Sequence, residues 1–445
     1  MQDYNTRIVF LGTSALGVVS GVIGTFLLLR KRSLLSDTVS HATLPGIALS
    51  YLIFETLFGN GKSLPLLLLG ATLTGLIGMG LVVLIPKWTR LKDDAALAIV
   101  LSVLFGLGIS LVTLIQQMPT GNSAGLEHYI YGKAASMTAM DTHIILAITL
   151  VVGLITFLFF KEFTVLCFDT AFAESQGISA SRLDLILMAL VVVVTVIGLQ
   201  AVGLLLVVAM LIIPSASARF WSEKLMTNLI LSAILGAASA FIGVFLSALF
   251  PKFPAGAVIV LTATTIFSLS MFLGTSRGLL VRYLAHCQIT RRINSQHLLR
   301  ACYECLETSG AIQNKSDTSL SYEAILSRRS WNQAELKRLL RQAQNDQLLE
   351  QVEGKRDEQR GENFYRLTDS GWGQAQRVVR NHRLWEMYLI EYADVAPGQV
   401  DRDADAIEHI LEPQLMSQLE DLLHAGRYGL RVPTSPHKLE QKAAT

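Results

Sequence analysis

Long apolar runs, separated by short polar breaks, fill the first 277 of the 445 residues. A helix needs about 20 mostly apolar residues to cross the roughly 30 Å of hydrocarbon in a bilayer. The pattern therefore predicts an all-α polytopic membrane domain over residues 1–277. We expect nine transmembrane helices, near residues 7–29, 38–57, 64–86, 95–117, 141–160, 183–198, 201–215, 226–249 and 255–274.

The stretch 183–215 is the least regular of these, because it also fits one long helix instead of two short helices broken at 198–200. An even number of spans would place the C-terminal half outside the cell, which conflicts with the character of that half, so we expect two helices. Lys and Arg concentrate on cytoplasmic loops, and basic clusters such as 30–32 and 277–292 fall on one side of this arrangement. We expect the N-terminus outside and the C-terminal half in the cytoplasm.

An acid and an imidazole stand four residues apart in RKRSLLSDTVSHATLPG, residues 30–46. At helical spacing Asp37 and His41 project from one face, and ionisable side chains close to a membrane span are usually functional. A carboxylate oxygen and a neutral imidazole nitrogen supply half of a coordination shell for a divalent transition metal. The pair therefore indicates a membrane protein that handles metal ions. The competing interpretation is that the two side chains hydrogen-bond to each other or reach headgroup water.

The run SLLSDTVSHATLPGIALSYLI resembles the signature of the ABC-3 permease family, the membrane subunits of bacterial importers for manganese, iron and zinc. The resemblance implies that Asp37 and His41 lie on the translocation path in the bacterial inner membrane. It also implies a separate ABC ATPase subunit, an extracytoplasmic metal-binding protein, and a membrane dimer with a second copy or a second permease. The segment 161–184 is similar to the family's coupling segment, which docks into the ATPase. The matching residues are Phe168, Asp169, Ala173 and Gly177. Without the family, this segment is a capped surface helix.

We expect no ATP site and no enzymatic activity in this chain. The segment Gly59–Ser63 ends like a phosphate-binding loop. Such a loop needs a glycine five positions before its second glycine, and a strand-to-helix context. Thr56 occupies that position and the segment joins two predicted spans. If the protein is an importer, ATP hydrolysis must come from a separate subunit.

After residue 277 the composition changes, because charged segments follow one another without a run long enough to span a membrane. The overall 51% hydrophobic and 16% charged residues thus average two unlike halves. For the second half, which we expect to be cytoplasmic and mostly α, we predict three parts. They are a linker over 278–290, a winged helix-turn-helix domain over 291–371, and metal-binding and dimerisation helices over 372–445.

The predicted winged helix-turn-helix rests on a helix with an apolar repeat over 336–343, followed by two short β-like runs. In such domains the second helix enters the major groove of DNA and a basic wing contacts phosphates. The candidate DNA-binding residues are Lys337, Arg338 and Arg341 on the helix and Lys355 and Arg356 in the wing. Acidic neighbours dilute this positive face, and a solvated basic helix without a nucleic-acid role is the alternative.

Two later segments offer metal ligands at helical spacing. His382 and Glu386 are four residues apart, and Asp405, Glu408 and His409 follow at i, i+3 and i+4. Each helix therefore presents one ligand-rich face, although ordinary surface ion pairs show the same spacing. With a winged helix, an HRLWE helix and an IEH helix in this order, the region resembles the metal-responsive DtxR/MntR repressor family.

This second resemblance implies a regulatory metal site. Its ligands would be His297, His382, Asp405, Glu408 and His409, with Glu386 as a ligand of an ancillary site. Histidine is not the usual residue of the family at the position of His297. Oxygen and imidazole ligands without thiolate suit Mn(II) or Fe(II) better than a softer ion. The family's SH3-like domain does not follow before Thr445, so we expect dimerisation and operator binding to be altered or lost.

Together, the two resemblances predict the permease subunit of a bacterial ABC importer for Mn(II) or Fe(II), with Zn(II) as a further candidate, carrying a cytoplasmic metal-sensing module. The alternative is a membrane-tethered or proteolytically released metal-dependent repressor whose spans serve as an anchor. The alternative predicts operator DNA binding by residues 290–445. The permease predicts uptake that survives the deletion of those residues.

Overall fold

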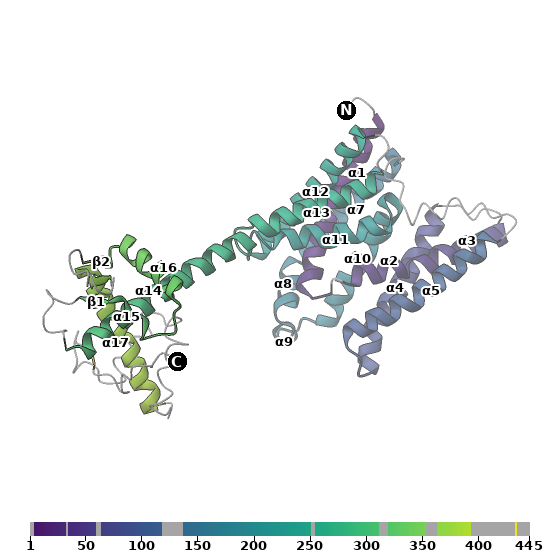
Figure 1. Ribbon diagram of the computed structural model, residues 1–445. Helices are drawn as coiled ribbons and strands as arrows, with labels where there is room; N and C mark the ends of the chain where they lie inside the picture. The colour runs from purple at the N-terminus through teal and green to yellow at the C-terminus, as the bar shows by residue number, and fades with distance from the viewer. Residues whose placement is uncertain are drawn as a thin grey trace. The chain divides into compact units, whose positions relative to one another are not determined.

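The computed structural model describes residues 4–32, 34–58, 64–117, 137–250, 254–310, 319–352, 363–392 and 432–433. The chain divides into two compact units, Met1–Tyr283 and Leu284–Thr445. Helices make up the described part of the first unit, and a small three-stranded sheet lies in the second (Figure 1).

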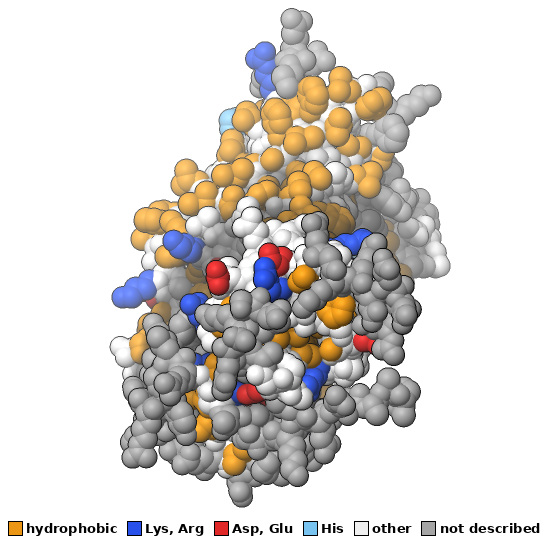
Figure 2. Space-filling view, turned by 60° about the vertical axis from the view of Figure 1, so that its left-hand side comes forward, with side chains coloured by type: hydrophobic (Ala, Val, Ile, Leu, Met, Phe, Trp, Pro, Cys, Tyr) orange, Lys and Arg blue, Asp and Glu red, His pale blue; other side chains and the backbone are white. Residues whose placement is uncertain are grey.

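The helices of the first unit include most of the expected spans. They are α1 (Tyr4–Leu29), α2 (Leu34–Ala42), α3 (Leu44–Phe58), α4 (Leu64–Trp88), α5 (Asp93–Gln116), α7 (Ala139–Leu158), α8 (Phe160–Phe168), α9 (Thr170–Ser175), α10 (Ala180–Val202), α11 (Leu204–Ala218), α12 (Leu225–Leu249) and α13 (Ala255–Leu273). Within the described residues, seven helices are long and apolar enough to cross a membrane: α1, α4, α5, α7, α10, α12 and α13. A shorter apolar helix lies in α11. Many hydrophobic side chains are exposed on this unit, as a lipid environment allows (Figure 2).

The span expected over 38–57 is divided between the short helix α2 and α3. Pro45 lies in the first turn of α3, where its missing N–H is tolerated, and it cannot continue the hydrogen-bond pattern of α2. The expected division of 183–215 into two helices is confirmed, with the break at Gly203. Gly203 has a φ of 85°, a conformation that glycine adopts readily.

Gly198, where the break was expected, lies inside α10 instead. A Cβ atom at this position would lie 2.6 Å from Val207 Cγ2 of α11. This glycine therefore allows α10 to pack closely against α11. From the sequence alone, a glycine that permits close packing cannot be told from one that ends a helix.

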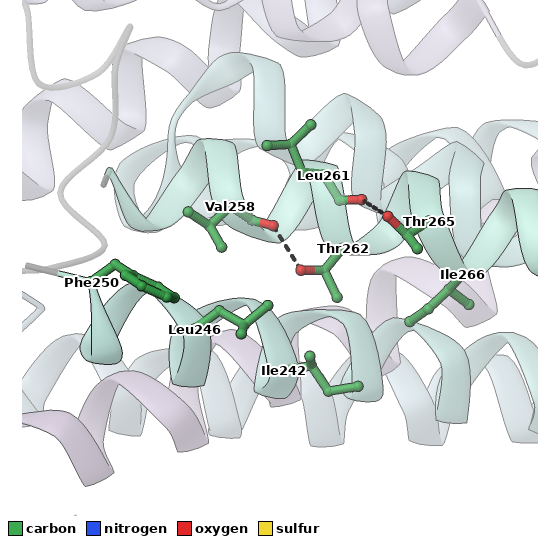
Figure 3. A pocket seen from close by; sticks show the side chains of 8 residues that line it. All are labelled: Ile242, Leu246, Phe250, Val258, Leu261, Thr262, Thr265 and Ile266. Carbon is green, nitrogen blue, oxygen red and sulfur yellow. Dashed lines mark hydrogen bonds between the residues drawn. The ribbon is translucent and has the colours of Figure 1, made fainter. Parts of the chain in front are cut away.

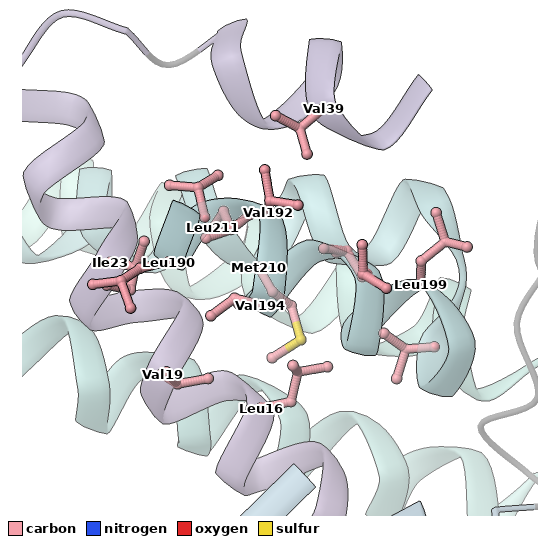
Figure 4. Close-up of a cluster of buried hydrophobic side chains, with 14 of the residues drawn as sticks. Leu16, Val19, Ile23, Val39, Leu190, Val192, Val194, Leu199, Met210 and Leu211 are labelled. Carbon is pink, nitrogen blue, oxygen red and sulfur yellow. The ribbon is translucent and has the colours of Figure 1, made fainter. Parts of the chain in front are cut away.

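The core of the first unit lies where α1, α10 and α11 meet. Its buried side chains include Leu16, Val19, Ile23, Val39, Leu190, Val192, Val194, Leu199, Met210 and Leu211 (Figure 4). Val39 belongs to α2. The core therefore anchors the short helix that carries Asp37 and His41.

Glycines bring α1 into backbone contact with α11 and α12. A Cβ atom on Gly17 would lie 2.4 Å from the carbonyl oxygen of Gly236 on α12. A Cβ atom on Gly24 would lie 1.7 Å from the carbonyl oxygen of Leu211 on α11. Small residues permit this approach between membrane helices, and van der Waals packing then stabilises the contact.

A second set of close contacts joins α3, α4 and α5. A Cβ atom on Gly46 of α3 would lie 2.2 Å from the carbonyl oxygen of Gly70 on α4. On α5, a Cβ atom at Gly108 would lie 3.1 Å from the backbone nitrogen of Pro45. These three helices therefore also pack backbone to backbone.

Helix α14 (Leu279–Thr308) begins in the first unit and ends in the second. Residues 279–290, expected to belong to a linker, are therefore the first turns of a long helix. No glycine or proline interrupts the sequence of α14, so nothing in the chain ends the helix earlier.

The second unit continues with β1 (Leu320–Ser321), α15 (Tyr322–Leu326), α16 (Gln333–Asn345), β2 (Leu349–Gln351), β3 (Phe364–Leu367) and α17 (Asp369–Tyr392). The sheet is antiparallel in the order β1-β3-β2, with Leu349 opposite Leu367. Leu336 and Leu340 of α16 are buried in the same core as Leu298 of α14. The predicted helix and the two strands after it are confirmed, and β1 adds a third strand.

Candidate functional site

Asp37 and His41 lie on α2, which packs against α4, α5 and α10. Asp37 is in the first turn and His41 in the last. Their side chains face each other, with His41 Nε2 3.4 Å from Asp37 Oδ1. The Asp37 side chain is 38% exposed and that of His41 is 20% exposed. The shared face predicted from the four-residue spacing is therefore present.

The two ring nitrogens of His41 have different surroundings. Nε2 faces Asp37 at 3.4 Å, whereas a charge-assisted hydrogen bond is typically about 2.7–2.9 Å. Nδ1 is buried and has no hydrogen-bond partner within the described part of the chain. Phe105 of α5 stands edge-on to the imidazole, with the ring centroids 4.5 Å apart. The contact with Asp37 is thus loose, and one nitrogen is left to a further partner.

The junction of α2 and α3 leaves one backbone oxygen without its usual helical donor. Because Pro45 has no N–H, the carbonyl group of His41 has no backbone amide donor four residues later. This carbonyl group lies at the C-terminal end of α2, where the helix dipole favours positive charge. A carboxylate, an imidazole and a backbone carbonyl group therefore occur together on one short helix.

An ion-pair network joins the end of α1 to α10. Arg30 Nη2 lies 3.1 Å from Asp184 Oδ1, and Arg32 Nη1 lies 2.6 Å from Asp184 Oδ2. Arg32 also pairs with Asp93 at 2.9 Å, and Arg30 Nη1 donates to the carbonyl group of Leu166 on α8 at 3.0 Å. The side chains of Arg30, Arg32 and Asp184 are each less than one-fifth exposed. In the sequence the two arginines indicate orientation alone, because nothing local relates them to an acid 152 or 154 residues later.

The predicted coupling residues lie at the end of α8, in α9 and in the turn after it. Asp169 caps α9, since its Oδ1 accepts a hydrogen bond from the Phe172 amide at 2.9 Å. Ala173 is fully buried, and Gly177 has a φ of 77° in the following turn. Phe168 is 67% exposed. The segment is therefore a fixed short helix beside an exposed aromatic side chain, and its docking role stays a prediction.

An apolar pocket of about 580 Å³ opens between α12 and α13 (Figure 3). Its lining residues are Ile242, Leu246, Phe250, Val258, Leu261, Thr262, Thr265 and Ile266. Thr262 and Thr265 each donate at 2.8 Å to a carbonyl group of their own helix. The lining therefore presents mainly hydrocarbon, which does not suit a metal ion that prefers oxygen and nitrogen ligands.

In the second unit, His382 lies buried between α14 and α17. Its Nδ1 is 2.9 Å from Arg300 Nη1 on α14, and its Nε2 is 3.2 Å from Glu386 Oε1 on α17. Arg300 Nε also donates to Glu304 Oε1 at 2.7 Å. The spacing of His382 and Glu386 correctly predicted neighbours. Sequence reasoning missed Arg300, because an Arg–Glu pair four residues apart usually lies on a helix surface.

The other predicted regulatory ligands are not brought to this pair within the described residues. His297 lies one turn before Arg300 on α14. Asp405, Glu408 and His409 lie outside the described residues. In the part of the chain that the structure describes, no three His, Cys, Asp or Glu side chains form a group that could hold a metal ion.

The basic face of α16 borders a pocket of about 590 Å³. Its lining includes Arg291 of α14 together with Lys337, Arg338 and Arg341 of α16. Sequence reasoning missed Arg291, which is far from α16 along the chain. The predicted wing residues Lys355 and Arg356 lie outside the described residues. Four cationic side chains around one hollow suit an anionic partner.

Residues 2–274, more than half of the chain, match the ABC 3 transport family. The chain belongs to the ABC 3 transport family. Residues 368–432 of this ABC 3 protein also match the metal binding and dimerisation domain of the iron dependent repressors. Both family resemblances are therefore confirmed, and the protein combines a multi-pass membrane unit with a repressor-type C-terminal domain.

Relatives of this ABC 3 protein include transport proteins of several bacteria. The manganese transport system membrane protein MntC of Bacillus subtilis is 36% identical over 403 residues, covering 91% of this chain and 88% of the relative. The zinc transport system membrane protein TroC of Treponema pallidum is 41% identical over 279 residues, covering 63% of this chain and 92% of the relative. The B. subtilis alignment is longer than the first unit, so that relative also shares part of the second.

A solved structure resembles the membrane unit of this ABC 3 protein. PsaBC from Streptococcus pneumoniae in complex with Fab matches with a TM-score of 0.55 and 30% identity. The match covers 64% of this chain and 95% of that chain.

Proposed function

We propose that this protein is the permease subunit of a bacterial ABC importer that moves Mn(II), Fe(II) or Zn(II) across the inner membrane. The observation that carries the proposal is the contact between Asp37 and His41 on a short helix inside a membrane bundle. Ionisable side chains in such places are usually functional. The names of the relatives, which are manganese and zinc transport proteins, support a divalent metal as substrate.

The metal ion is the substrate, so its site must release it as well as bind it. Asp37 supplies a negative charge, and a neutral His41 supplies a nitrogen lone pair. The Asp37 side chain is partly exposed, and in this proposal water fills the remaining positions. A site with few protein ligands binds weakly enough for onward movement.

We also propose partners and an orientation for the permease. A separate ABC ATPase subunit hydrolyses ATP and docks on the segment with Phe168, Asp169, Ala173 and Gly177. An extracytoplasmic binding protein delivers the metal. The permease forms a membrane dimer with itself or with a second permease. The N-terminus lies outside and the second unit lies in the cytoplasm, as the basic loops suggest.

Metal uptake tests this function. We expect radiolabelled Mn(II) to accumulate in a transporter-deficient bacterium that produces this chain together with its ATPase and binding protein. Unlabelled Fe(II) and Zn(II), added as competitors, rank the three metals. If none of the three metals accumulates above the level of cells without the permease, the proposed function is wrong.

The network of Arg30, Arg32 and Asp184 offers a route from the coupling segment to the metal-binding helix. Arg30 contacts α8 and α10, and Arg32 precedes α2 by two residues. We expect Asp184→Asn to lower uptake by at least roughly fivefold, the lower end of coupling between sites, while the ATPase remains active. Uptake and ATP hydrolysis are measured on the same preparation in proteoliposomes.

The exposed ion pair of Arg277 and Glu223, 3.3 Å apart, provides a matched control for this experiment. Exposed pairs contribute little, so Glu223→Gln should leave uptake unchanged. A coupling role for the network is wrong if Asp184→Asn transports as well as the wild type, or if it loses uptake and ATP hydrolysis to the same extent.

We further propose that the C-terminal domain senses a divalent metal ion through His382 and Glu386, with Asp405, Glu408 and His409 as further ligands. Oxygen and imidazole donors of this kind suit Mn(II) or Fe(II). The match to the metal binding and dimerisation domain of iron dependent repressors supports this proposal. The ion would have a structural role: it would link helices by coordination and take part in no reaction.

A membrane-tethered repressor is the second candidate function, and the basic pocket of Arg291, Lys337, Arg338 and Arg341 favours it. Deleting Leu284–Thr445 separates the two functions. For a permease, we expect the shortened protein to retain metal uptake, because Asp37 and His41 lie in the first unit. For a tethered repressor, the full chain should bind operator DNA with an affinity that falls steeply with salt, and cells should lack permease-dependent uptake.

A further inference from the structure

Arg300 occupies the nitrogen of His382 whose lone pair a metal ion would need. A guanidinium group has hydrogen-bond donors and no acceptor. Arg300 Nη1 must therefore donate to His382 Nδ1, which lies 2.9 Å away. A neutral imidazole has one acceptor nitrogen, so its Nε2 carries the proton. Glu386 Oε1 lies 3.2 Å from this Nε2.

In this arrangement the imidazole has no lone pair to offer, although a histidine ligand must offer one. If His382 were to coordinate through Nδ1, Arg300 would occupy the position of the ion. Coordination through Nε2 would move the proton to Nδ1, where it would face the N–H of Arg300. Both alternatives require Arg300 to leave the imidazole first.

We propose that Arg300 is an internal cation that competes with a divalent metal ion for His382. This inference rests on the proposed metal sensing by the C-terminal domain. Arg300 can withdraw without becoming an unpaired buried charge, because its Nε stays bonded to Glu304 at 2.7 Å. Glu386, whose side chain is fully buried, then takes part in binding the ion. In this proposal either Arg300 or the metal ion occupies the position beside His382 where α14 and α17 meet.

Metal binding by the full-length protein in lipid nanodiscs tests the competition, with Co(II) as the spectroscopic probe. Asp37→Ala and His41→Ala are present in every sample, so that the transport site does not contribute. The test variant adds Arg300→Leu and Glu304→Gln, which removes both charges of the pair and avoids a single unpaired charge. We expect its Kd for Co(II), from visible absorption, to fall roughly ten- to hundredfold, as loss of one charge-assisted hydrogen bond implies.

A neighbouring ion pair gives a matched control. Arg383 of α17 pairs with Glu307 of α14 and donates to the carbonyl group of Pro433. Arg383→Leu with Glu307→Gln should leave the Kd unchanged. Adding His382→Ala to the test variant should abolish its gain. Thermal melts followed by circular dichroism identify any variant that does not fold, and Arg300→Met with Glu304→Gln replaces the test variant if it melts early.

The two proposals fail in different ways. If the parent protein already binds Co(II) as tightly as the test variant, Arg300 is not a competitor, and metal sensing stands without it. The same conclusion holds if the control pair produces an equal gain. If neither the parent nor any folded variant binds Co(II), metal sensing by the domain is wrong, and the competition is wrong with it.

Discussion

Uptake of Mn(II) is expected to fall to background when either Asp37 or His41 is replaced by alanine. The two side chains are in contact on α2 and are the proposed ligands of the transported ion. Loss of a residue that merely supports a metal ligand lowers affinity or activity by roughly 10–100-fold, so loss of a ligand should cost at least as much. Initial rates of radiolabelled uptake, divided by the amount of permease in the membrane fraction, measure the effect.

His143 provides the matched control for this prediction. It lies on α7 and is exposed. His143→Ala removes the same chemical group and should transport at the wild-type rate. Normal uptake by Asp37→Ala, with a normal amount of protein in the membrane, would show that the ion takes another path.

Gly24→Ala is expected to destabilise the membrane unit by on the order of 3 kcal/mol, the upper part of the usual range for overpacking. A methyl group on Gly24 would lie 1.7 Å from the carbonyl oxygen of Leu211, and a backbone atom cannot rotate away. Alanine itself favours a helix by about 1 kcal/mol relative to glycine, so the expected loss runs against intrinsic propensity. Fluorescence-detected gel filtration and thermal melting of the detergent-solubilised chain measure it.

Gly153→Ala makes the same chemical change where a Cβ atom would meet nothing within 4 Å. We expect this variant to be as stable as the wild type or slightly more stable, because the gain in helix propensity is unopposed. Equal stability of the two variants would mean that α1 and α11 are not in backbone contact.

Hydropathy predicted the long helices of the membrane unit well, because a span needs a minimum length of apolar residues and little else. It did not predict that 38–57 is divided, since the apolar run of α3 dominates this stretch and Pro45 is compatible with either a helix start or a kink. The break in 183–215 was expected at 198–200 and lies at Gly203. The sequence shows where glycines are but not what they contact. The continuity of α14 through residues 279–290 was missed because a change of composition was taken for a change of structure.

The candidate sites were predictable where the residues are neighbours along a helix. Four-residue spacing placed Asp37 beside His41 and His382 beside Glu386, and both contacts are present. Contacts between distant elements were not predictable. The pairing of Arg30 with Asp184 spans 154 residues, and that of Arg300 with His382 spans 82. A single sequence has no period or motif that relates such partners.

The glycine contacts join helices of the membrane unit into two groups. Helices in backbone contact cannot slide past each other without first moving apart. We therefore expect α1, α11 and α12 to move together, and α3, α4 and α5 to move together. Helix α2 meets α4 and α10 through side chains, as at Gly78, where a Cβ atom would approach Ala42 Cβ to 2.9 Å. If the protein transports metal ions as proposed, we expect alternating access to occur by rocking along α2, where the proposed ion-binding pair of Asp37 and His41 lies.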